Sequence, residues 1–276
     1  MNLFEPFFDP EDLSACVSAE TKVQDVNALA RAHGIYFPLW IDPEQTFGEL
    51  YLRHRVCSRS FRFGLIGDNV LGLRFRLKNG RCVDLGGRVV KNVTGFDLTR
   101  FFSGSQGVFG TPETLVLRLR PLAPFQKTMI LSGPFQALET FRAALMASAW
   151  VHAVDSFDFE VKNGMTRLAL GWSCDSQDSQ VFEKAFRQLG TECGCECFFG
   201  AAPRHDIRPR FRYQLPLSEV LIQAATLEKK HGGNASGFLG HGVLHFNPEY
   251  GLPDKGPVEH HQELEGRLGA LLEALP

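Results

Sequence analysis

Apolar residues recur with two different periods along the first 124 residues of this chain. In the segment Glu113 to Arg120, leucine stands at every second position, which is the spacing of a strand with one buried face, and Pro121 follows it. In the segment Thr94 to Phe102 the apolar residues have helical spacing, so a short helix is expected to begin near Thr94. A longer amphipathic helix is expected within Val23 to Leu39, ending at the His33-Gly34 pair.

The pattern changes near Pro124, which predicts two domains, residues 1–124 and 125–276. Asn163-Gly164 suits a hairpin turn, and Asp178 and Ser179 suit a helix start. The order expected after Lys127 is strand, helix, strand, strand, helix, strand, which is the ferredoxin-like arrangement. These elements are expected at Thr128 to Leu131, Gln136 to Ser148, Ser156 to Val161, Thr166 to Trp172, Gln180 to Leu189 and Cys195 to Phe199.

The pattern is less regular after residue 200. A helix is expected over Ser218 to Lys230 and a strand over Gly242 to Phe246. An amphipathic helix is expected from about Val258 to Leu275.

Composition narrows the class of protein. With 44% apolar and 22% charged residues, the chain has the material for two cores and is expected to be a soluble globular protein. Its 29 basic and 31 acidic residues form no long runs and give a formal net charge of −2, which argues against a nucleic-acid partner and against a membrane-surface protein. No apolar run approaches the roughly 20 residues that span a bilayer, and no signal-like segment is apparent, so no membrane span and a cytoplasmic location are expected.

Six arginines make the region between Arg53 and Arg76 locally basic. The simpler interpretation is a solvated strand face. An anion-binding surface, suited to a flavin diphosphate or an acidic partner, is the alternative.

Cysteine and histidine clusters raise the question of a metal site. The seven cysteines, an odd number, suit a reducing compartment, and three of them form the triplet Cys193, Cys195 and Cys197. In a strand these three thiols would share one face without the turn that a zinc site uses, so no metal is expected. His241 and His245 have i, i+4 spacing, but the residues between them alternate like a strand, which favours packed or exposed histidines.

The segment Gly86 to Arg120 carries the clearest functional pattern. Four of its small residues, Gly104, Ser105, Gly107 and Gly110, lie within seven positions. Glycine permits positive φ angles and lets main-chain N–H groups approach a bound molecule. On spacing alone, a ligand site built from backbone and a glycine-rich hairpin that only turns the chain both remain open.

The run GGRVVKNVTGFDLTRFFSGSQGVFG resembles the FAD-domain signature of the vanillyl-alcohol-oxidase (PCMH) flavoproteins. The resemblance extends to Thr46-Phe47-Gly48, Arg62-Phe63-Gly64 and the segment Asp68 to Gly72, and covers roughly the first 125 residues. It implies an α+β fold in which the second half of a PCMH-type FAD-binding domain is followed by a ferredoxin-like α+β cap domain. It implies FAD binding along Gly48, Gly64, Asp68, Gly87, Lys91, Asn92, Gly95, Asp97, Gly104, Ser105, Gly107 and Gly110.

The chain also departs from the family pattern. Family members begin with a βαβ subdomain that holds the FAD pyrophosphate, and this chain is expected to start too late to contain it. Glu49 replaces a family glycine, and Val56 and Cys57 replace a usual Ser-Gly pair. A carboxylate near a phosphate is repulsive, so weakened FAD binding is expected.

Two functions remain open at this point. The first is a subunit of an FAD-linked 2-hydroxy-acid oxidase or dehydrogenase, with a small 2-hydroxy acid as substrate and a second subunit supplying the missing FAD half or an iron–sulfur centre. The second is a degenerate paralogue that keeps the fold as a structural or interaction subunit without binding FAD by itself. No catalytic base is assigned from the sequence; Arg210, Arg212, His241 and His245 are the polar cap residues of first interest.

Overall fold

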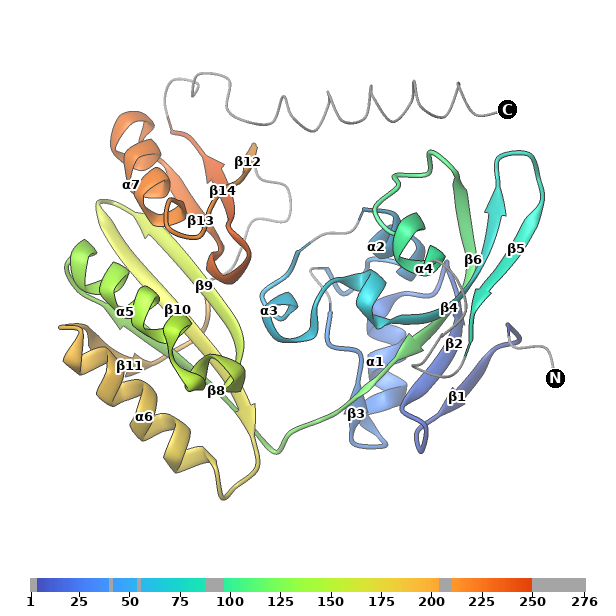
Figure 1. Cartoon of the computed structure of the whole chain (residues 1–276), viewed down its shortest axis with the longest axis horizontal. Helices are drawn as coiled ribbons and strands as arrows, with labels where there is room; N and C mark the ends of the chain where they lie inside the picture. The colour runs from blue at the N-terminus through green and yellow to red at the C-terminus, as the bar shows by residue number, and fades with distance from the viewer. Residues whose placement is uncertain (1–3, 40–41, 54–55, 88–96, 204–209, 250–276) are drawn as a thin grey trace. The chain divides into compact units, whose positions relative to one another are not determined.

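The computed structural model describes residues 4–39, 42–53, 56–87, 97–203 and 210–249 (Figure 1). The chain divides into two compact units, Met1–Pro124 and Phe125–Pro276, and each is described by itself. Both units combine helices with antiparallel sheets, which confirms the expected α+β class. The C-terminal helix expected over Val258 to Leu275 lies outside the described residues.

The first unit is built on a five-stranded antiparallel sheet with the order β1-β2-β6-β4-β5. A separate two-stranded ribbon pairs β3 with β7. The strands are β1 (Phe7–Asp9), β2 (Ser14–Ser18), β3 (Ile35–Tyr36), β4 (Val70–Leu77), β5 (Cys82–Gly86), β6 (Gly110–Arg118) and β7 (Arg120–Pro121). The helices are α1 (Val23–Arg31), α2 (Phe47–Arg53), α3 (Ser60–Phe63), the 3-10 turn η1 (Ile66–Asn69) and α4 (Leu98–Phe102).

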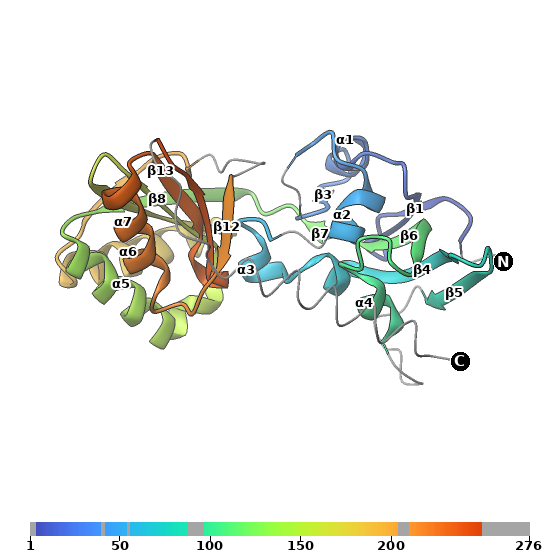
Figure 2. The same ribbon diagram turned by 90° about the horizontal axis from the view of Figure 1, so that it is seen from above.

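One face of this sheet carries the core of the first unit. Leu115 and Leu117 of β6 alternate toward the same face and pack with the apolar sides of α1 and α2. Figure 2 shows α1 and α2 on the same side of the sheet. Phe75 of β4 stacks on Phe102 of α4, with ring centroids 4.5 Å apart and planes 12° apart. Each such buried side chain contributes about 1.5–3 kcal/mol, so α4 is fixed to the sheet mainly by Phe102.

The second unit is built on a seven-stranded antiparallel sheet with the order β11-β8-β10-β9-β13-β14-β12. Its elements follow the chain as β8 (Phe125–Ser132), α5 (Phe135–Ala147), the 3-10 turn η2 (Ala149–Ala153), β9 (Val154–Lys162), β10 (Met165–Cys174), α6 (Ser179–Glu192) and β11 (Glu196–Phe199). They continue as β12 (Phe211–Gln214), α7 (Val220–His231), β13 (Asn234–Phe238), the 3-10 turn η3 (Leu239–His241) and β14 (Val243–Asn247). The expected order of strands and helices between Lys127 and Phe199 is therefore present.

Three helices cover one face of this larger sheet (Figures 1 and 2). Phe141 of α5 contacts Phe157 of β9 edge to face, and Phe186 of α6 contacts Trp172 of β10. On α7, His231 contacts Phe246 of β14. The strand registers place these three sheet residues on a single face. The residues that alternate with them, which include most of the polar residues of these strands, point to the opposite face.

Two sequence expectations need correction at the level of elements. The expected strand over Glu113 to Arg120 begins earlier, at Gly110, and ends at Arg118, because β7 leaves the sheet to pair with β3. The cysteine triplet does not lie in one strand: Cys193 caps the end of α6, and β11 begins only at Glu196. The three thiols therefore do not form the single row that alternation predicts.

Candidate cofactor site

Helix α4 begins at a capped aspartate. The Asp97 carboxylate accepts hydrogen bonds from the Arg100 N–H at 3.2 Å and from Thr99 Oγ1 at 2.6 Å. Burial opposes ionisation, but these hydrogen bonds and the Arg100 charge outweigh it and hold the pKa of Asp97 below its ordinary value. The expected helix start near Thr94 falls outside the described residues, and the described helix begins at Leu98.

Arg100 ties α4 to the turn that precedes β4. Its guanidinium lies 3.0 Å from Asp68 Oδ1 and 3.3 Å from Asp97 Oδ2. Asp68 Oδ2 also accepts the Leu65 N–H at 2.7 Å, which closes the turn after Gly64. Two of the residues expected at the cofactor site, Asp68 and Asp97, are thus brought together through one arginine and shape the backbone around it.

The loop after α4 is anchored to α2. The N–H groups of Gly104 and Gln106 donate to the carbonyls of Tyr51 and Leu52 at 2.9 and 3.0 Å, and Ser105 N–H donates to Phe102 O at 3.3 Å. The Tyr51 hydroxyl donates to Thr99 O, and burial raises the pKa of this phenol. The Val108 N–H also donates to Ser105 O, at 2.9 Å, so four main-chain donors of the glycine loop serve the fold and are not free for a ligand.

The glycines expected at the cofactor site fall into two groups. In the first, packing or backbone geometry requires glycine. A Cβ on Gly48 would lie 3.1 Å from Ala19 Cβ, one on Gly64 (φ +73°) would lie 2.5 Å from Asp68 Oδ2, and one on Gly110 (φ +149°) would lie 1.9 Å from Arg76 O. These three glycines are explained by the fold alone.

In the second group the space beside the glycine is open. Among the described residues, a Cβ on Gly87 would meet nothing within 4 Å, and one on Gly107 would meet only Gly110 O, at 3.7 Å, although the φ of +83° at Gly107 itself favours glycine. The Gly107 N–H also has no hydrogen-bond partner in the part of the chain that the structure describes. Gly87 and Gly107 are therefore the positions where a bound molecule has room to approach the backbone.

Ser105 supplies a side chain of this loop that fits a cofactor. Its Oγ is buried, and no hydrogen-bond partner for it exists among the described residues. A buried hydroxyl without a partner costs about 1–3 kcal/mol, so such a group is expected to meet a ligand or a water. Ser105 Oγ together with the Gly107 N–H fits a polar cofactor group at this loop. Lys91, Asn92 and Gly95 lie outside the described residues.

Two of the three residues that depart from the family pattern are buried in the first unit, and the third lies on the surface of α2. Val56 and Cys57 are buried, and Cys57 belongs to the core of the first unit. Glu49 is exposed in the first turn of α2, and its N–H donates to Thr46 Oγ1 at 3.2 Å. Cys57 therefore fills core volume where the family pattern has a small residue.

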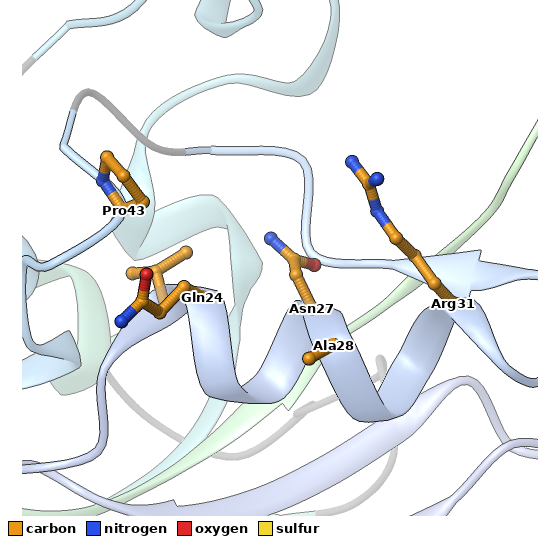
Figure 3. A pocket seen from close by; sticks show the side chains of 6 residues that line it. Gln24, Asn27, Ala28, Arg31 and Pro43 are labelled. Carbon is orange, nitrogen blue, oxygen red and sulfur yellow. The ribbon is translucent and has the colours of Figure 1, made fainter.

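A shallow pocket lies elsewhere in the first unit, along α1 (Figure 3). It has a volume of about 250 Å³ and is lined by Val23, Gln24, Asn27, Ala28, Arg31 and Pro43. Gln24 already donates to Glu44 at 2.5 Å, and the Asn27 amide is hydrogen-bonded to both the N–H and the carbonyl of Phe37. The polar groups of this pocket are largely used inside the protein, so we assign no cofactor to it.

The polar cap residues of the second unit lie at one end of its sheet. His245 of β14 pairs in register with Arg212 of β12 and with Ser236 of β13. His245 is buried and contacts the Phe238 ring, with centroids 5.4 Å apart. His241 lies on η3, before the strand, so the two histidines do not share a face; Arg210 donates its N–H to Asn247. Among the described residues, no group of three or more His, Cys, Asp or Glu is arranged to hold a metal ion.

Sequence reasoning missed two residues of the first unit. Asn69 and Arg120 are hydrogen-bonded to each other next to Phe63, and nothing in their spacing indicates it. The only feature of the sequence that points toward this pair is the basic character of the region Arg53 to Arg76.

No helix in the described part of the chain combines the length and the apolar character needed to cross a membrane.

Comparison with known proteins gives the family context. No protein-family model matches the chain. It is 28% identical over 184 residues to the mitochondrial D-lactate dehydrogenase (cytochrome) of Arabidopsis thaliana, covering 66% of this chain and 32% of that protein. It is 31% identical over 126 residues to the glycolate oxidase subunit GlcD of Bacillus subtilis, covering 44% of this chain and 26% of that protein. The chain thus spans about a third or less of these relatives' length.

A solved structure of alkyldihydroxyacetonephosphate synthase has a similar fold. It superposes with a TM-score of 0.57 at 12% identity, over 71% of this chain and 41% of that chain. This similarity bears on the fold alone. The resemblance of the sequence to flavoproteins such as the FAD-binding subunit of glycolate oxidase is confirmed by the curated relatives. This chain is accordingly a homologue of the FAD-linked oxidoreductases that include D-lactate dehydrogenase and the glycolate oxidase subunit GlcD.

Proposed function

We propose that this chain is the FAD-binding part of an oxidoreductase that acts on a small 2-hydroxy acid. The observation that carries the proposal is the loop after α4, where a buried Ser105 hydroxyl with no partner among the described residues lies two residues from the open Gly107 backbone. The loop lies within the run that carries the flavoprotein signature. The relatives that support the substrate class are named for D-lactate and glycolate.

The two units take different roles in this proposal. Residues 1–124 form part of a PCMH-type FAD-binding domain, and residues 125–276 form the α+β cap that contacts the substrate. Support for the second role comes from the side chains of Arg212, Ser236 and His245, which lie on the sheet face opposite to the one that α5 to α7 cover. Arg212 is exposed on this face, and Ser236 and His245 are buried.

Within the first unit, Ser105 and the backbone at Gly87 and Gly107 hold the cofactor. By resemblance to the family pattern, Lys91, Asn92 and Gly95 also contact the cofactor. Gly48, Gly64 and Gly110 shape the backbone around it, and Asp68, Asp97 and Gly104 fix the loop through Arg100 and Tyr51. When bound, FAD supplies a hydride acceptor, and the protein supplies binding, orientation and electrostatics.

Binding by this chain is proposed to be weak. Four N–H donors of the glycine loop are bonded to carbonyls of the protein, and Glu49 adds a negative charge where the family pattern has a glycine. A second subunit that contributes further FAD contacts, or an iron–sulfur centre, would complete the enzyme. The relative from Bacillus subtilis is itself named as a subunit.

The alternative, a structural paralogue that binds no flavin, is not favoured. The matched relatives are oxidoreductases, and position 87 keeps glycine although a Cβ there would meet none of the described atoms within 4 Å. Reduction of a dye acceptor by the FAD-loaded protein, with D-lactate, glycolate and D-2-hydroxyglutarate compared, tests the proposed activity. Turnover with at least one of these acids, lost when FAD is omitted, is expected; flavin that stays bound but is reduced by none of them contradicts the proposed substrate class.

A further inference from the structure

Three arginines of the first unit gather around two aromatic rings. The Cζ atoms of Arg62 and Arg120 lie 5.7 and 5.6 Å from the centroid of the Phe63 ring. The Tyr36 ring meets Phe63 edge to face, with centroids 6.5 Å apart. The Arg59 Cζ lies 5.3 Å from the Tyr36 centroid, and its Nη1 donates to the Tyr36 hydroxyl at 2.6 Å. We call Arg59, Arg62 and Arg120 the arginine cluster.

The fold sets the position of Arg120 before any ligand arrives. Arg120 of β7 pairs in register with Tyr36 of β3, so their side chains emerge on the same face of this ribbon. Arg120 Nη2 donates to Asn69 Oδ1 at 3.1 Å. The Asn69 side chain is fully buried, and its Nδ2 donates to the carbonyls of Phe63 and Leu65 at 2.7 and 2.9 Å. One buried amide thus fixes both the guanidinium and the turn that carries the Phe63 ring.

Arg120 has no carboxylate partner among the described residues. Its hydrogen-bond partner is the neutral amide of Asn69, and its buried Nε has no partner. Two other arginines of the same unit differ: Arg74 pairs with Asp84 at 2.7 Å, and Arg76 pairs with Glu113. Burial and the neighbouring positive charge of Arg118, together with that of Arg62, hold the pKa of Arg120 below its ordinary value. An anion beside Arg120 would offset the free-energy cost of holding this positive charge in a partly buried position next to other arginines.

The arginine cluster adjoins the proposed cofactor site through a single turn. Asp68 of that turn faces Gly64 and Arg100, on the side of the glycine loop. Asn69, the next residue, faces Arg120. The backbone between Phe63 and Asn69 therefore separates the loop that fits a cofactor from a positively charged group of side chains.

We propose that the arginine cluster binds an oxyanion, with Arg120 as its central donor and the carboxylate of the 2-hydroxy acid as its source. This inference rests on the proposed function. Guanidinium groups are planar donors that match a carboxylate in a two-pronged geometry, and the neutral Asn69 amide holds that of Arg120 in place without neutralising its charge. The diphosphate of FAD has the same oxyanion chemistry, and the test separates the two sources.

The test is isothermal titration calorimetry of the whole chain without FAD. Oxalate, an unreactive dicarboxylate, and pyrophosphate are the two probes. Arg120→Gln removes the central donor and is expected to weaken oxalate binding at least about tenfold, in line with a lost charge-assisted pair. Arg74→Gln, which removes an arginine already paired with Asp84, is the matched control and is expected to leave oxalate affinity unchanged.

The outcomes separate the inference from the proposed function. Pyrophosphate bound in preference to oxalate, and lost in Arg120→Gln, assigns the cluster to the cofactor and overturns the carboxylate source. Equal affinity of wild type and Arg120→Gln for both probes, or no binding of either, overturns the site altogether. Because FAD retention is measured separately, a chain that binds FAD but neither probe keeps its proposed function. Arg62→Gln, at an exposed position, is expected to weaken oxalate binding in the same direction and replaces Arg120→Gln if that variant does not fold.

Discussion

Asn69 and Arg120 lie 51 positions apart in the chain and meet through a hydrogen bond of 3.1 Å between Oδ1 and Nη2. The same Asn69 amide donates to two carbonyls of the turn after α3. The bond therefore joins the ribbon of β3 and β7 to the turn that leads into β4, beside the proposed cofactor site. Asn69 is a structural organiser of both the turn and the arginine cluster.

Replacing Asn69 is expected to destabilise the first unit. Asn69→Ala leaves the carbonyls of Phe63 and Leu65 without their buried donor, so the free energy of unfolding is expected to fall by about 2–3 kcal/mol. Urea denaturation followed by circular dichroism measures it. Asn79→Ala, at an exposed turn where the side chain accepts only the Arg81 N–H, is the control and is expected to cost less than about 1 kcal/mol. Equal losses in the two variants would show that Asn69 is an ordinary polar residue.

The two groups of glycines are expected to respond differently to alanine. Gly110→Ala places a Cβ 1.9 Å from Arg76 O at a φ of +149°, so it is expected to cost at least about 3 kcal/mol and to break the pairing of β6 with β4. The methyl group of Gly87→Ala would meet none of the described atoms within 4 Å, so this variant is expected to change stability by less than about 0.5 kcal/mol.

Flavin retention then separates folding from binding. Gly87→Ala is expected to keep its melting temperature but to retain less FAD after gel filtration, because the added methyl occupies the open side of the backbone. Normal FAD retention in a stably folded Gly87→Ala protein would remove Gly87 from the proposed site.

Acidification is expected to weaken the cap of α4. The pKa of Asp97 is lower in the folded chain than its ordinary value of 3.8, so its contribution is present above pH 3.8 and is lost as pH falls through the folded pKa. Asp97→Ala is expected to cost about 0.5–1 kcal/mol at pH 7, a figure reduced for the exposure of the side chain, and almost nothing once the carboxylate is protonated.

The matched variant for this test is Asp97→Asn, since asparagine caps a helix as well as aspartate but does not titrate. Thermal melts at pH 7 and at acid pH compare the three proteins. A stability difference between wild type and Asp97→Ala that is the same at both pH values would mean that the carboxylate charge contributes nothing.

Local patterns were sufficient for much of the fold. The alternating leucines of β6 and the order of elements between Lys127 and Phe199 follow from residue spacing, and Asn163 and Gly164 have the positive φ angles that a tight hairpin turn requires. The limit appears where long-range packing decides. Residue spacing cannot show which glycines are required by packing. The atoms that would crowd a Cβ at Gly48 and Gly110 belong to Ala19 and Arg76, which are distant in the sequence, whereas no described atom crowds one at Gly87.

The candidate site was predictable only in outline. Sequence places the glycine loop, but the partners of its N–H groups, Tyr51 and Leu52, are on another helix, and no local pattern indicates them. The arginine cluster could not be predicted for the same reason, since Arg120 comes near Arg59 and Arg62 only because β7 pairs with β3. The expectation that the three cysteines share one strand face was wrong because α6 extends to Glu192 and Cys193 is its C-cap.

The most direct test of the account is whether this chain holds a flavin through the loop after α4. The purified protein is incubated with FAD, passed through a desalting column and examined by near-ultraviolet and visible absorption, with a titration of FAD fluorescence in parallel. Saturable FAD binding is predicted, together with weaker binding by Ser105→Ala at unchanged thermal stability, because that variant removes the buried hydroxyl assigned to the cofactor. A folded protein that retains no flavin and shows no saturable titration, or a Ser105→Ala variant that binds FAD as tightly as wild type, would contradict it.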